Sequence, residues 1–448
     1  MDHPAHAEPE VSEKVSSRIY EEELRYVSPG LQEVAQLSRL VIKEGHGCWL
    51  TDVDNRSYLD LMAGVAVCSL GHSHRRYVAA IKEQLEKVTA GSFTTENRMK
   101  LLRLIASLTP PGLNRTQLYS GGSEAVEAAI RLAKSYTKGF EVLGFWGGFH
   151  GKTGGVLGLI GDPFKKQWGA LHPGLHLAPY ADCYRCPFDT TYPGCGIFCL
   201  DFVRKVIEKN TAGSIAAILV EPMQGTAGNV IPPPEFLPGL LQIAHENNAL
   251  LIADEMITGF GRTGKMFGCN HTGVTPDVLT IGKGMGNGFP ISGLVSMDEI
   301  TASQPFSKAS SSSSSYGGNP LASTAALGTI QTIIEDSLVE NSLKVGNHLL
   351  EGLKGLEEKY EFIGHVRGLG LMIGVELVKN RKTKEPLERA VTRQIFLELL
   401  KRGMISMSYK ANFRINPPLI LKKEEADIAL QILDDVFSFV RDHIRYKE

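Results

Sequence analysis

The chain has 448 residues and a formal charge of −2 at pH 7, because 47 lysines and arginines face 49 aspartates and glutamates. This balance argues against nucleic acid as a partner, since binding to phosphates calls for a basic face. With 43% apolar and 21% charged residues, the composition is that of a globular protein. It excludes disordered, collagen-like and coiled-coil classes and fits roughly two to three domains.

The N-terminal sequence and the cysteines predict a compartment. The segment MDHPAHAEPEVSEK lacks the basic and apolar regions of a secretory signal. The sequence has no run of about 20 apolar residues that would span a bilayer. Seven cysteines are too few, and odd in number, for a disulfide scaffold in a chain of this length. We therefore expect a protein of the reducing cytoplasm that does not act in a membrane.

Short β-like pieces occupy residues 40–61, and residues 77–88 carry apolar side chains at helical spacing. The centre of the chain then alternates between apolar runs and helix-like segments such as 123–134 and 234–246. Runs this apolar indicate strands that are buried on both faces of a parallel sheet. The sequence therefore predicts an α/β fold. The runs are 141–145, 216–221, 249–254 and 277–282.

The pattern changes after Gly328 to long amphipathic segments with one β-like piece at 370–377. We therefore predict a large domain at residues 66–328 and a smaller C-terminal α+β domain at residues 329–448. Residues 1–65 form an N-terminal segment that joins the smaller domain.

Ligands of an open α/β sheet bind beyond the carboxyl ends of its strands, so the residues that follow the predicted strands are candidates for a site. Gly121-Gly122-Ser123 precedes an alanine-rich helix. Its N–H groups, its hydroxyl and the helix dipole would suit an anion, although a plain helix N-cap is the alternative. Phe149 and His150 follow the run 141–145, and Phe149 is either a flat group for a ring or a core residue.

Glu221, Asp254 and Lys283 stand at the ends of the next three apolar runs. Asp254 could hold a proton on a heterocyclic nitrogen or cap a helix, and Glu221 could equally anchor a loop or a salt bridge. Lys283 lies between two glycines, where desolvation would lower the pKa of its amine and allow a Schiff base; a surface charge is the alternative. An anion cradle, a lysine, an acid and a flat group are together what pyridoxal phosphate needs.

Several segments resemble, in order and spacing, the class III pyridoxal-phosphate-dependent aminotransferases of fold type I. This family includes 4-aminobutyrate, ornithine and ω-amino acid transaminases and 2,2-dialkylglycine decarboxylase. The similarity covers about residues 35–440 and implies a mostly parallel central sheet with a smaller α+β domain. The segments are YSGGSEAVEAAIRLAK, FWGGFHGKTGG, EPMQGTAGNVIPP, LLIADEMITGFGRTGKMF and PDVLTIGKGMGNGFPISG.

The resemblance implies that Lys283 forms the covalent link to pyridoxal phosphate and that Asp254 pairs with its pyridinium nitrogen. Ser315 matches the residue that reaches the phosphate of the neighbouring subunit, which implies a homodimer with shared sites, or a tetramer. That match replaces the flexible loop that a serine run such as 308–320 would otherwise suggest. The other cofactor contacts implied are Gly121, Gly122 and Ser123 for the phosphate, Phe149 with His150 and, opposite, Met256 for the ring faces, and Glu221 and Gln224 near the phenolic oxygen.

Arg414 matches the arginine that grips a substrate α-carboxylate, where a bidentate fork suits the geometry; a structural salt bridge is the alternative. Members that use 4-aminobutyrate or ornithine carry a glutamate at the position of Thr226 to neutralise that arginine. Threonine cannot do this, which argues against those substrates. The glutamine and tryptophan of dialkylglycine decarboxylase would fall at Val65 and Phe149, so orientation control of decarboxylation is absent.

Cys183, Cys186, Cys195 and Cys199 have a spacing that suits zinc, with a loop of free thiols as the alternative. Any metal there would be structural, and we assign no catalytic metal. We predict an aminotransferase that moves an amino group from an amine or amino acid to a keto acid, pyruvate or 2-oxoglutarate. The rivals are a decarboxylase or racemase with the same cofactor, and a zinc-binding interaction protein on an inactive scaffold. The sequence leaves the donor open.

Overall fold

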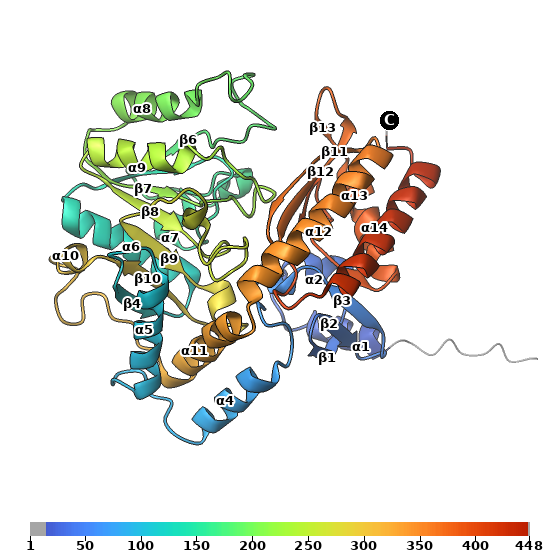
Figure 1. The fold of residues 1–448 in the computed structure, drawn as a ribbon, viewed down its shortest axis with the longest axis horizontal. Helices are drawn as coiled ribbons and strands as arrows, with labels where there is room; N and C mark the ends of the chain where they lie inside the picture. Colours follow the sequence, from blue (N-terminus) through green and yellow to red (C-terminus); the bar gives the residue numbers. More distant parts are fainter. Residues whose placement is uncertain (1–14, 447–448) are drawn as a thin grey trace, which may run out of the picture.

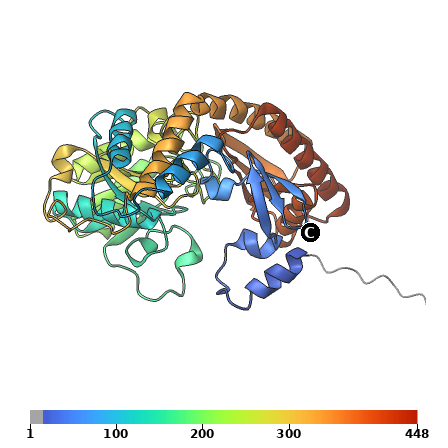
Figure 2. The ribbon, with the colours of Figure 1, turned by 90° about the horizontal axis from the view of Figure 1, so that it is seen from below.

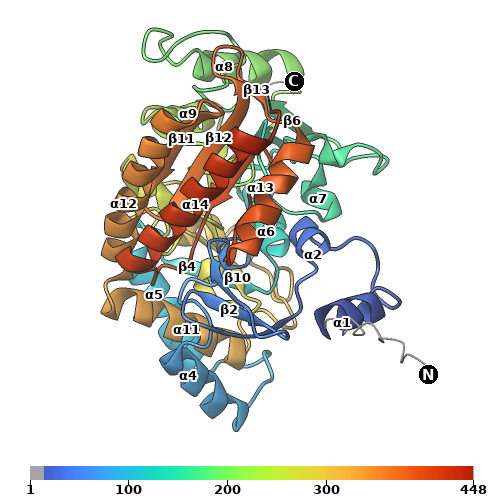
Figure 3. The ribbon, with the colours of Figure 1, turned by 90° about the vertical axis from the view of Figure 1, so that its right-hand side faces the viewer.

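The computed structural model describes residues 15–446, so the first 14 residues of the predicted N-terminal segment lie outside it. The ribbon shows a large sheet with its helices, coloured teal to yellow, beside the orange and red C-terminal elements (Figure 1). The blue N-terminal strands lie with the C-terminal elements, as the views from below and from the side also show (Figures 2 and 3). Within residues 15–446, no helix is long and apolar enough to cross a membrane.

The large sheet has seven strands. Five of them, from β9 to β6, run parallel, whereas β10 is antiparallel to both of its neighbours. The predicted α/β fold with a mostly parallel central sheet is thereby confirmed. In spatial order the strands are β4 (Arg115–Tyr119), β10 (Ser292–Ser296), β9 (Val278–Ile281), β8 (Leu250–Asp254), β7 (Ile215–Val220), β5 (Glu141–Phe145) and β6 (Leu175–Ala178).

Both faces of this sheet are buried. Successive side chains of a strand point to opposite faces, and both sets pack in hydrophobic cores. Leu250 and Ile252 pack in one core with the alanine-rich helix α6 (Gly122–Thr137). Leu251 and Ala253 pack in the other core, which α5 (Glu96–Leu108), α8 (Phe198–Asn210), α9 (Phe236–Glu246) and α11 (Pro320–Glu335) share. Continuous apolar runs are what strands between two layers of helices require.

The N-terminal strands share a sheet with the far end of the chain. The strand β3 (Ser57–Asp60) pairs in parallel with β14 (Met404–Ile405), and β1 (Ile42–His46) and β2 (Trp49–Asp52) extend this sheet. The division into parts at residues 65 and 328 itself stays a prediction.

A third sheet contains β11 (Ile363–Leu369), β12 (Met372–Asn380), β13 (Glu385–Pro386) and β15 (Asn412–Ile415). The helices over it are α12 (Leu338–Lys359), α13 (Arg389–Lys401) and α14 (Lys423–His443). The other helices are α1 (Val15–Glu23), α2 (Glu33–Ser38), α3 (Ala63–Ala66), α4 (Arg75–Leu85), α7 (Gly154–Leu157) and α10 (Asp298–Thr301), and the 3-10 turns are η1 (Pro163–Lys165), η2 (Gly268–His271) and η3 (Lys283–Met285).

Candidate active site

A cavity of about 300 Å³ lies beyond the carboxyl ends of β4, β5, β8 and β9. This is the edge at which ligands of open α/β sheets bind, and the volume lies at the lower end of the range for ligand sites. Seven of the residues that we singled out from the sequence line it: Gly122, Ser123, Phe149, His150, Asp254, Met256 and Lys283. The sequence reasoning did not single out its other lining residues, Val67, Ser120, Gly151, Gly288, Phe289, Pro290 and Ile291.

Lys283 follows β9 and has a left-handed backbone, with φ of 42°. The glycines on either side are required by close packing. A Cβ at Gly282 would lie 2.6 Å from the sulfur of Met256, and one at Gly284 would lie 2.5 Å from the Oγ of Ser69. Burial lowers the pKa of Lys283, and the charge of Arg414 lowers it further, while the carboxylates of Asp254 and Glu221 oppose the shift. The cavity therefore holds an amine that loses its proton more readily than an exposed lysine does, as a nucleophile requires.

Asp254, the last residue of β8, forms a buried pair with His150. The distance from Nδ1 of His150 to Oδ2 of Asp254 is 2.7 Å, and Oδ1 accepts hydrogen bonds from Thr280 Oγ1 at 3.0 Å and from Met256 N at 3.1 Å. Burial opposes the charge on both groups, but their mutual attraction prevails: the pKa of Asp254 is lowered and that of His150 is raised. A carboxylate kept charged in this way could stabilise a protonated ring nitrogen.

The helix α6 begins next to the cavity, with Gly121 as its N-cap. Glu124 accepts hydrogen bonds from the N–H groups of Gly121 at 2.7 Å and Ser120 at 3.2 Å. The following residues, Gly122 and Ser123, face the cavity at the positive end of the helix dipole. This arrangement suits a phosphate group.

The loop after β5 approaches this turn closely at Gly151, which has a φ of 118°. A Cβ there would lie 2.0 Å from the Oγ of Ser123. Only glycine therefore lets the loop that carries Phe149 and His150 approach the start of α6.

Glu221 and Gln224 do not line the cavity but organise its loops. The carboxylate of Glu221 accepts hydrogen bonds from Phe149 N at 3.0 Å and from Gly225 N at 2.9 Å, and Gln224 Nε2 donates to the carbonyl of Trp146 at 2.8 Å. Burial raises the pKa of Glu221, and the nearby Asp254 raises it too, against the charge of His150 and the two N–H donors. For Glu221, the alternative role of a loop anchor describes these contacts. A role of Glu221 and Gln224 near the phenolic oxygen of a cofactor stays a prediction.

Arg414 in β15 forms no ion pair within the part of the chain that the structure describes. Among the described residues, its guanidinium makes one hydrogen bond, from Nη1 to the carbonyl of Gly225 at 3.5 Å. Burial lowers the pKa of its guanidinium, while Tyr409 and Glu221 raise it. The alternative of a structural salt bridge is therefore not found within the described residues. A half-buried cation without an anion is unfavourable, so this position suits an anionic ligand.

The other predicted residues lie outside the cavity wall. The side chain of Val65 packs against the cluster of Phe396, Met407 and Tyr409. The carbonyl of Thr226 accepts a hydrogen bond from Asn412 Nδ2 at 3.4 Å. Ser315 is exposed in a segment without helix or strand, and within this chain it does not reach the cavity.

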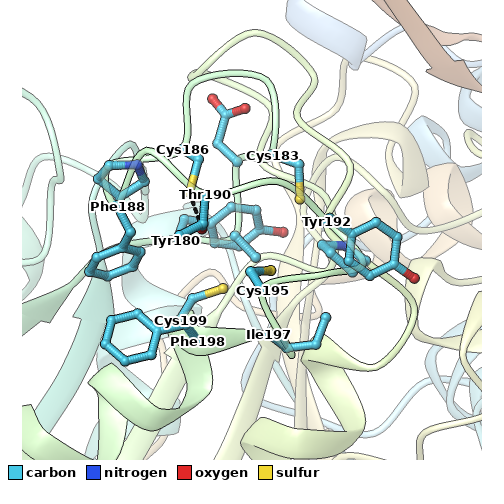
Figure 4. A pocket seen from close by; sticks show the side chains of 14 residues that line it. Tyr180, Cys183, Cys186, Phe188, Thr190, Tyr192, Cys195, Ile197, Phe198 and Cys199 are labelled. Atoms are coloured by element: carbon cyan, nitrogen blue, oxygen red, sulfur yellow. Dashed lines mark hydrogen bonds between the residues drawn. The ribbon is translucent and has the colours of Figure 1, made fainter.

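The four cysteines of the loop between β6 and α8 line a second, smaller cavity with Tyr180 and Phe188 (Figure 4). Their thiols are free, and that of Cys186 lies 3.4 Å from the hydroxyl of Thr190. Burial, helped by the neighbouring thiols, raises the pKa of the partly buried Cys199 to about 11. Among residues 15–446 no three groups of histidine, cysteine or acid are arranged to hold a metal ion. The geometry therefore describes a cluster of reduced thiols.

The chain matches the class III aminotransferase family over residues 31–437 and belongs to it. The leucine/methionine racemase of Thermococcus litoralis is 36% identical over 400 residues, which cover 87% of this chain and 89% of that one. The acetylornithine aminotransferase of Caldanaerobacter subterraneus subsp. tengcongensis is 34% identical over 90% of this chain and 95% of its own.

Solved structures give the same class. An (S)-enantioselective ω-transaminase from Thermomicrobium roseum superposes with a TM-score of 0.89 at 30% identity, covering 95% of this chain and 99% of that chain. An amine transaminase from an uncultivated Pseudomonas species, solved with pyridoxal phosphate bound, superposes with a TM-score of 0.86 at 31% identity, covering 92% and 98%. The chain is thus a class III transaminase of fold type I, an enzyme class that uses pyridoxal phosphate, rather than an inactive scaffold.

Proposed function

We propose that this enzyme moves an amino group from an amine or amino acid to a keto acid, pyruvate or 2-oxoglutarate, in two half-reactions. The observation that carries the proposal is the convergence of Lys283, the Asp254–His150 pair and the start of α6 on one cavity. These groups match the aldehyde, the ring nitrogen and the phosphate of pyridoxal phosphate in chemistry and number.

This proposal gives each residue of the cavity a defined role. Pyridoxal phosphate, when bound, supplies an aldehyde for the donor amine and a ring that accepts electrons from the bond to be broken. Lys283 holds the cofactor by its aldehyde and then, as a free amine, moves the proton at the donor carbon. Asp254, kept charged by His150, keeps the ring nitrogen protonated. The N–H groups of Gly122 and Ser123 and the hydroxyl of Ser123 would bind the phosphate, because the N–H of Gly121 already donates to Glu124. Phe149 and Met256 would cover the two ring faces.

Arg414 would bind the carboxylate of an α-amino acid or α-keto acid, because no carboxylate of the described chain pairs with it. Thr226 follows Gly225, whose carbonyl lies 3.5 Å from the guanidinium, and brings no competing charge. A keto acid acceptor, and an α-amino acid donor, would therefore meet an unpaired arginine, which favours α-carboxylate substrates.

We expect Thr226→Glu to raise KM for 2-oxoglutarate about tenfold, because the new carboxylate would pair with Arg414 and compete with the substrate. Steady-state kinetics at varied keto acid measure this effect. Thr226→Gln is the matched control, since it adds similar volume without charge, and its KM should stay within about twofold. An equal rise in both variants would contradict the role of Arg414.

Racemisation is the second candidate, because the Thermococcus litoralis relative is a leucine/methionine racemase. The same lysine and aspartate would serve it, with the proton returning to the donor carbon instead of moving on to the cofactor. Incubating one enantiomer of leucine, methionine or alanine without keto acid separates the two outcomes. Appearance of the other enantiomer would favour a racemase, whereas keto acid-dependent amine transfer favours the transaminase.

We further propose that two copies form a homodimer on the face that carries Ser315. Phe93 is 74% exposed and Tyr316 is 75% exposed, which is unusual for large apolar side chains. The two segments are neighbours, since a Cβ at Gly91 would lie 3.1 Å from the carbonyl oxygen of Ser315. A second subunit would cover the exposed side chains of Phe93 and Tyr316 beside Ser315.

The double variant Phe93→Ser with Tyr316→Ser is expected to weaken the dimer, with a Kd that rises at least about tenfold. Aromatic side chains at an interface often contribute about 2 kcal/mol or more each. Sedimentation equilibrium measures the dissociation. Trp168→Ser, at a side chain that is 63% exposed elsewhere, is the control. A monomeric parent protein, or equal weakening in the control, would rule out this surface.

The assay that tests the proposed reaction is a donor screen with the holoenzyme. It compares α-amino acids, ω-amino acids and simple amines, each with pyruvate and with 2-oxoglutarate as acceptor. Transfer to a keto acid with at least one donor class supports the proposal. Failure with every donor, in protein that has bound the cofactor, would overturn it.

A further inference from the structure

The segment α3 (Ala63–Ala66) is a turn of left-handed helix. Its four residues have φ values of 49°, 62°, 67° and 62°, and hydrogen bonds from Ala66 N to Met62 O at 2.9 Å and from Val67 N to Ala63 O at 2.7 Å close it. L-residues disfavour this backbone because Cβ crowds the carbonyl oxygen, and β-branched Val65 is the worst placed. Only Gly64 adopts it freely. The surrounding structure must therefore hold the turn in place.

The turn adjoins the loop of the proposed catalytic lysine. Val67, which follows the turn, lines the cavity. The carbonyl oxygen of Ala66 is 3.7 Å from the position that a Cβ on Gly284 would take, and Gly284 follows Lys283. The turn thus adjoins the cavity wall at Val67 and the loop of the amine at Gly284.

The other side of the turn faces the proposed carboxylate site. Val65 and Met62 pack against the cluster that contains Tyr409. Tyr409 in turn interacts electrostatically with the guanidinium of Arg414. The left-handed turn is therefore in contact with the lysine loop on one side and, through Tyr409, with the surroundings of Arg414 on the other.

One buried carboxylate holds the turn at its start. Asp60, the last residue of β3, accepts hydrogen bonds through Oδ1 from Met62 N at 2.9 Å and from Ala63 N at 2.8 Å. Its second oxygen, Oδ2, is 2.9 Å from Nε2 of His72. His72 thereby fixes the orientation of the carboxylate, and the carboxylate fixes the first two N–H groups of the turn.

We propose that Asp60 and His72 are positioning residues that impose the left-handed turn and so set the substrate end of the active site. They touch neither the lysine nor the cofactor site, and act through Val65 and Val67. The kinetic part of this inference rests on the proposed function, because it needs a turnover to measure. Without the clamp, the strained turn would relax toward commoner backbone angles and move the cavity wall while leaving Lys283 and Asp254 in place.

The chain contains a matched control for this clamp. Asp277 also accepts a backbone hydrogen bond, from Leu251 N at 2.7 Å, and also pairs with a histidine, His245, whose Nε2 lies 3.1 Å away. Asp277 precedes β9, whereas Lys283 follows it, so this pair lies at the opposite end of the sheet. If losing an aspartate–histidine pair affected only the stability of the fold, the variants of both pairs should show the same change.

The experiment compares Asp60→Ala and His72→Ala with Asp277→Ala and His245→Ala as holoenzymes. We expect the first two to raise KM for the amino donor about tenfold, as for the loss of one or two positioning hydrogen bonds. Their kcat and their cofactor absorbance should stay within about threefold of the parent. The two controls should leave KM unchanged. Asp60→Asn, which keeps the acceptor Oδ1, and His72→Gln, which keeps a donor, should restore KM to within about threefold.

Hydrogen exchange gives a readout that does not need activity. The amides of Ala66 and Val67 should exchange at least about tenfold faster in Asp60→Ala and His72→Ala than in the parent, and unchanged in the controls. Should Asp60→Ala fail to fold, His72→Ala carries the same comparison, because its side chain is 19% exposed rather than fully buried. Unchanged KM and exchange in both clamp variants, or an equal rise in the controls, would overturn the inference. An inactive parent with the exchange result intact would overturn the proposed function and leave the clamp standing.

Discussion

Replacing Lys283 with alanine is expected to lower kcat for transamination by at least about 10⁴-fold, because in the proposed mechanism this one side chain supplies both the covalent link and the proton transfer. The variant should also lose the long-wavelength absorbance of the covalently bound cofactor. Absorbance spectra and single-turnover kinetics with the best donor measure the two effects.

Lys265→Ala is the control, since that amine donates to the carbonyl of Asn270 at 3.1 Å on the surface and should leave both properties unchanged. Substantial turnover in Lys283→Ala, or a parent protein that gains no absorbance with pyridoxal phosphate, would refute the assignment. The variant should remain folded, because removing a desolvated amine that is unfavourably charged relieves the native state.

Asp254→Asn is expected to lower kcat/KM by about 10²- to 10⁴-fold, because a protonated ring nitrogen that loses its buried carboxylate partner would lose about 3–5 kcal/mol of stabilisation. The pKa of His150 should fall, since the carboxylate that raises it is gone. In the parent protein, His150 should therefore stay protonated up to a higher pH than in Asp254→Asn. Histidine signals in an NMR titration and donor kinetics measure the two effects.

Asp277→Asn, which removes a buried carboxylate from the other end of β9, should change neither the kinetics nor the titration of His150. Retention of parental kcat/KM in Asp254→Asn would show that the ring nitrogen does not depend on this charge. A lower kcat/KM with an unchanged His150 titration would contradict the pairing of the two side chains in solution.

The sequence predicted the central sheet well because its strands are buried on both faces. Apolar runs at 141–145 and 249–254 correspond to β5 (Glu141–Phe145) and β8 (Leu250–Asp254) almost residue for residue. Only residues between two apolar layers give such continuous runs. By contrast, the pairing of β3 with β14 joins residues that are about 345 positions apart, and no local pattern encodes it.

The same logic located the site, because residues that follow parallel strands meet at one edge. Asp254 and Lys283 were found in this way. The sequence could not show how His150 would point, and its hydrogen bond to Asp254 depends on the path of a glycine-rich loop. Nor could it show the left-handed turn, since Ala63, Val65 and Ala66 have no local preference for positive φ.

The spacing of the four cysteines suggested a zinc site, but it predicted only that they lie near one another. Four thiols in 17 residues are close in sequence, and they do line one cavity. Ligand geometry also requires their sulfur atoms to converge on a point, which spacing alone cannot guarantee. The identity of the amino donor is likewise not encoded in a local pattern. It depends on side chains of the cavity rim and on surfaces that a second copy would complete.

The sheet that is buried on both faces limits where this enzyme can evolve. A substitution inside β7, β8 or β9 disturbs two packed layers at once, and most such changes reduce stability. The residues of the proposed site lie beyond the strand ends and have no such double constraint. Divergence toward a new substrate or outcome is thus confined to a few rim positions around an unchanging frame, which gives directed-evolution libraries a small and well-defined target.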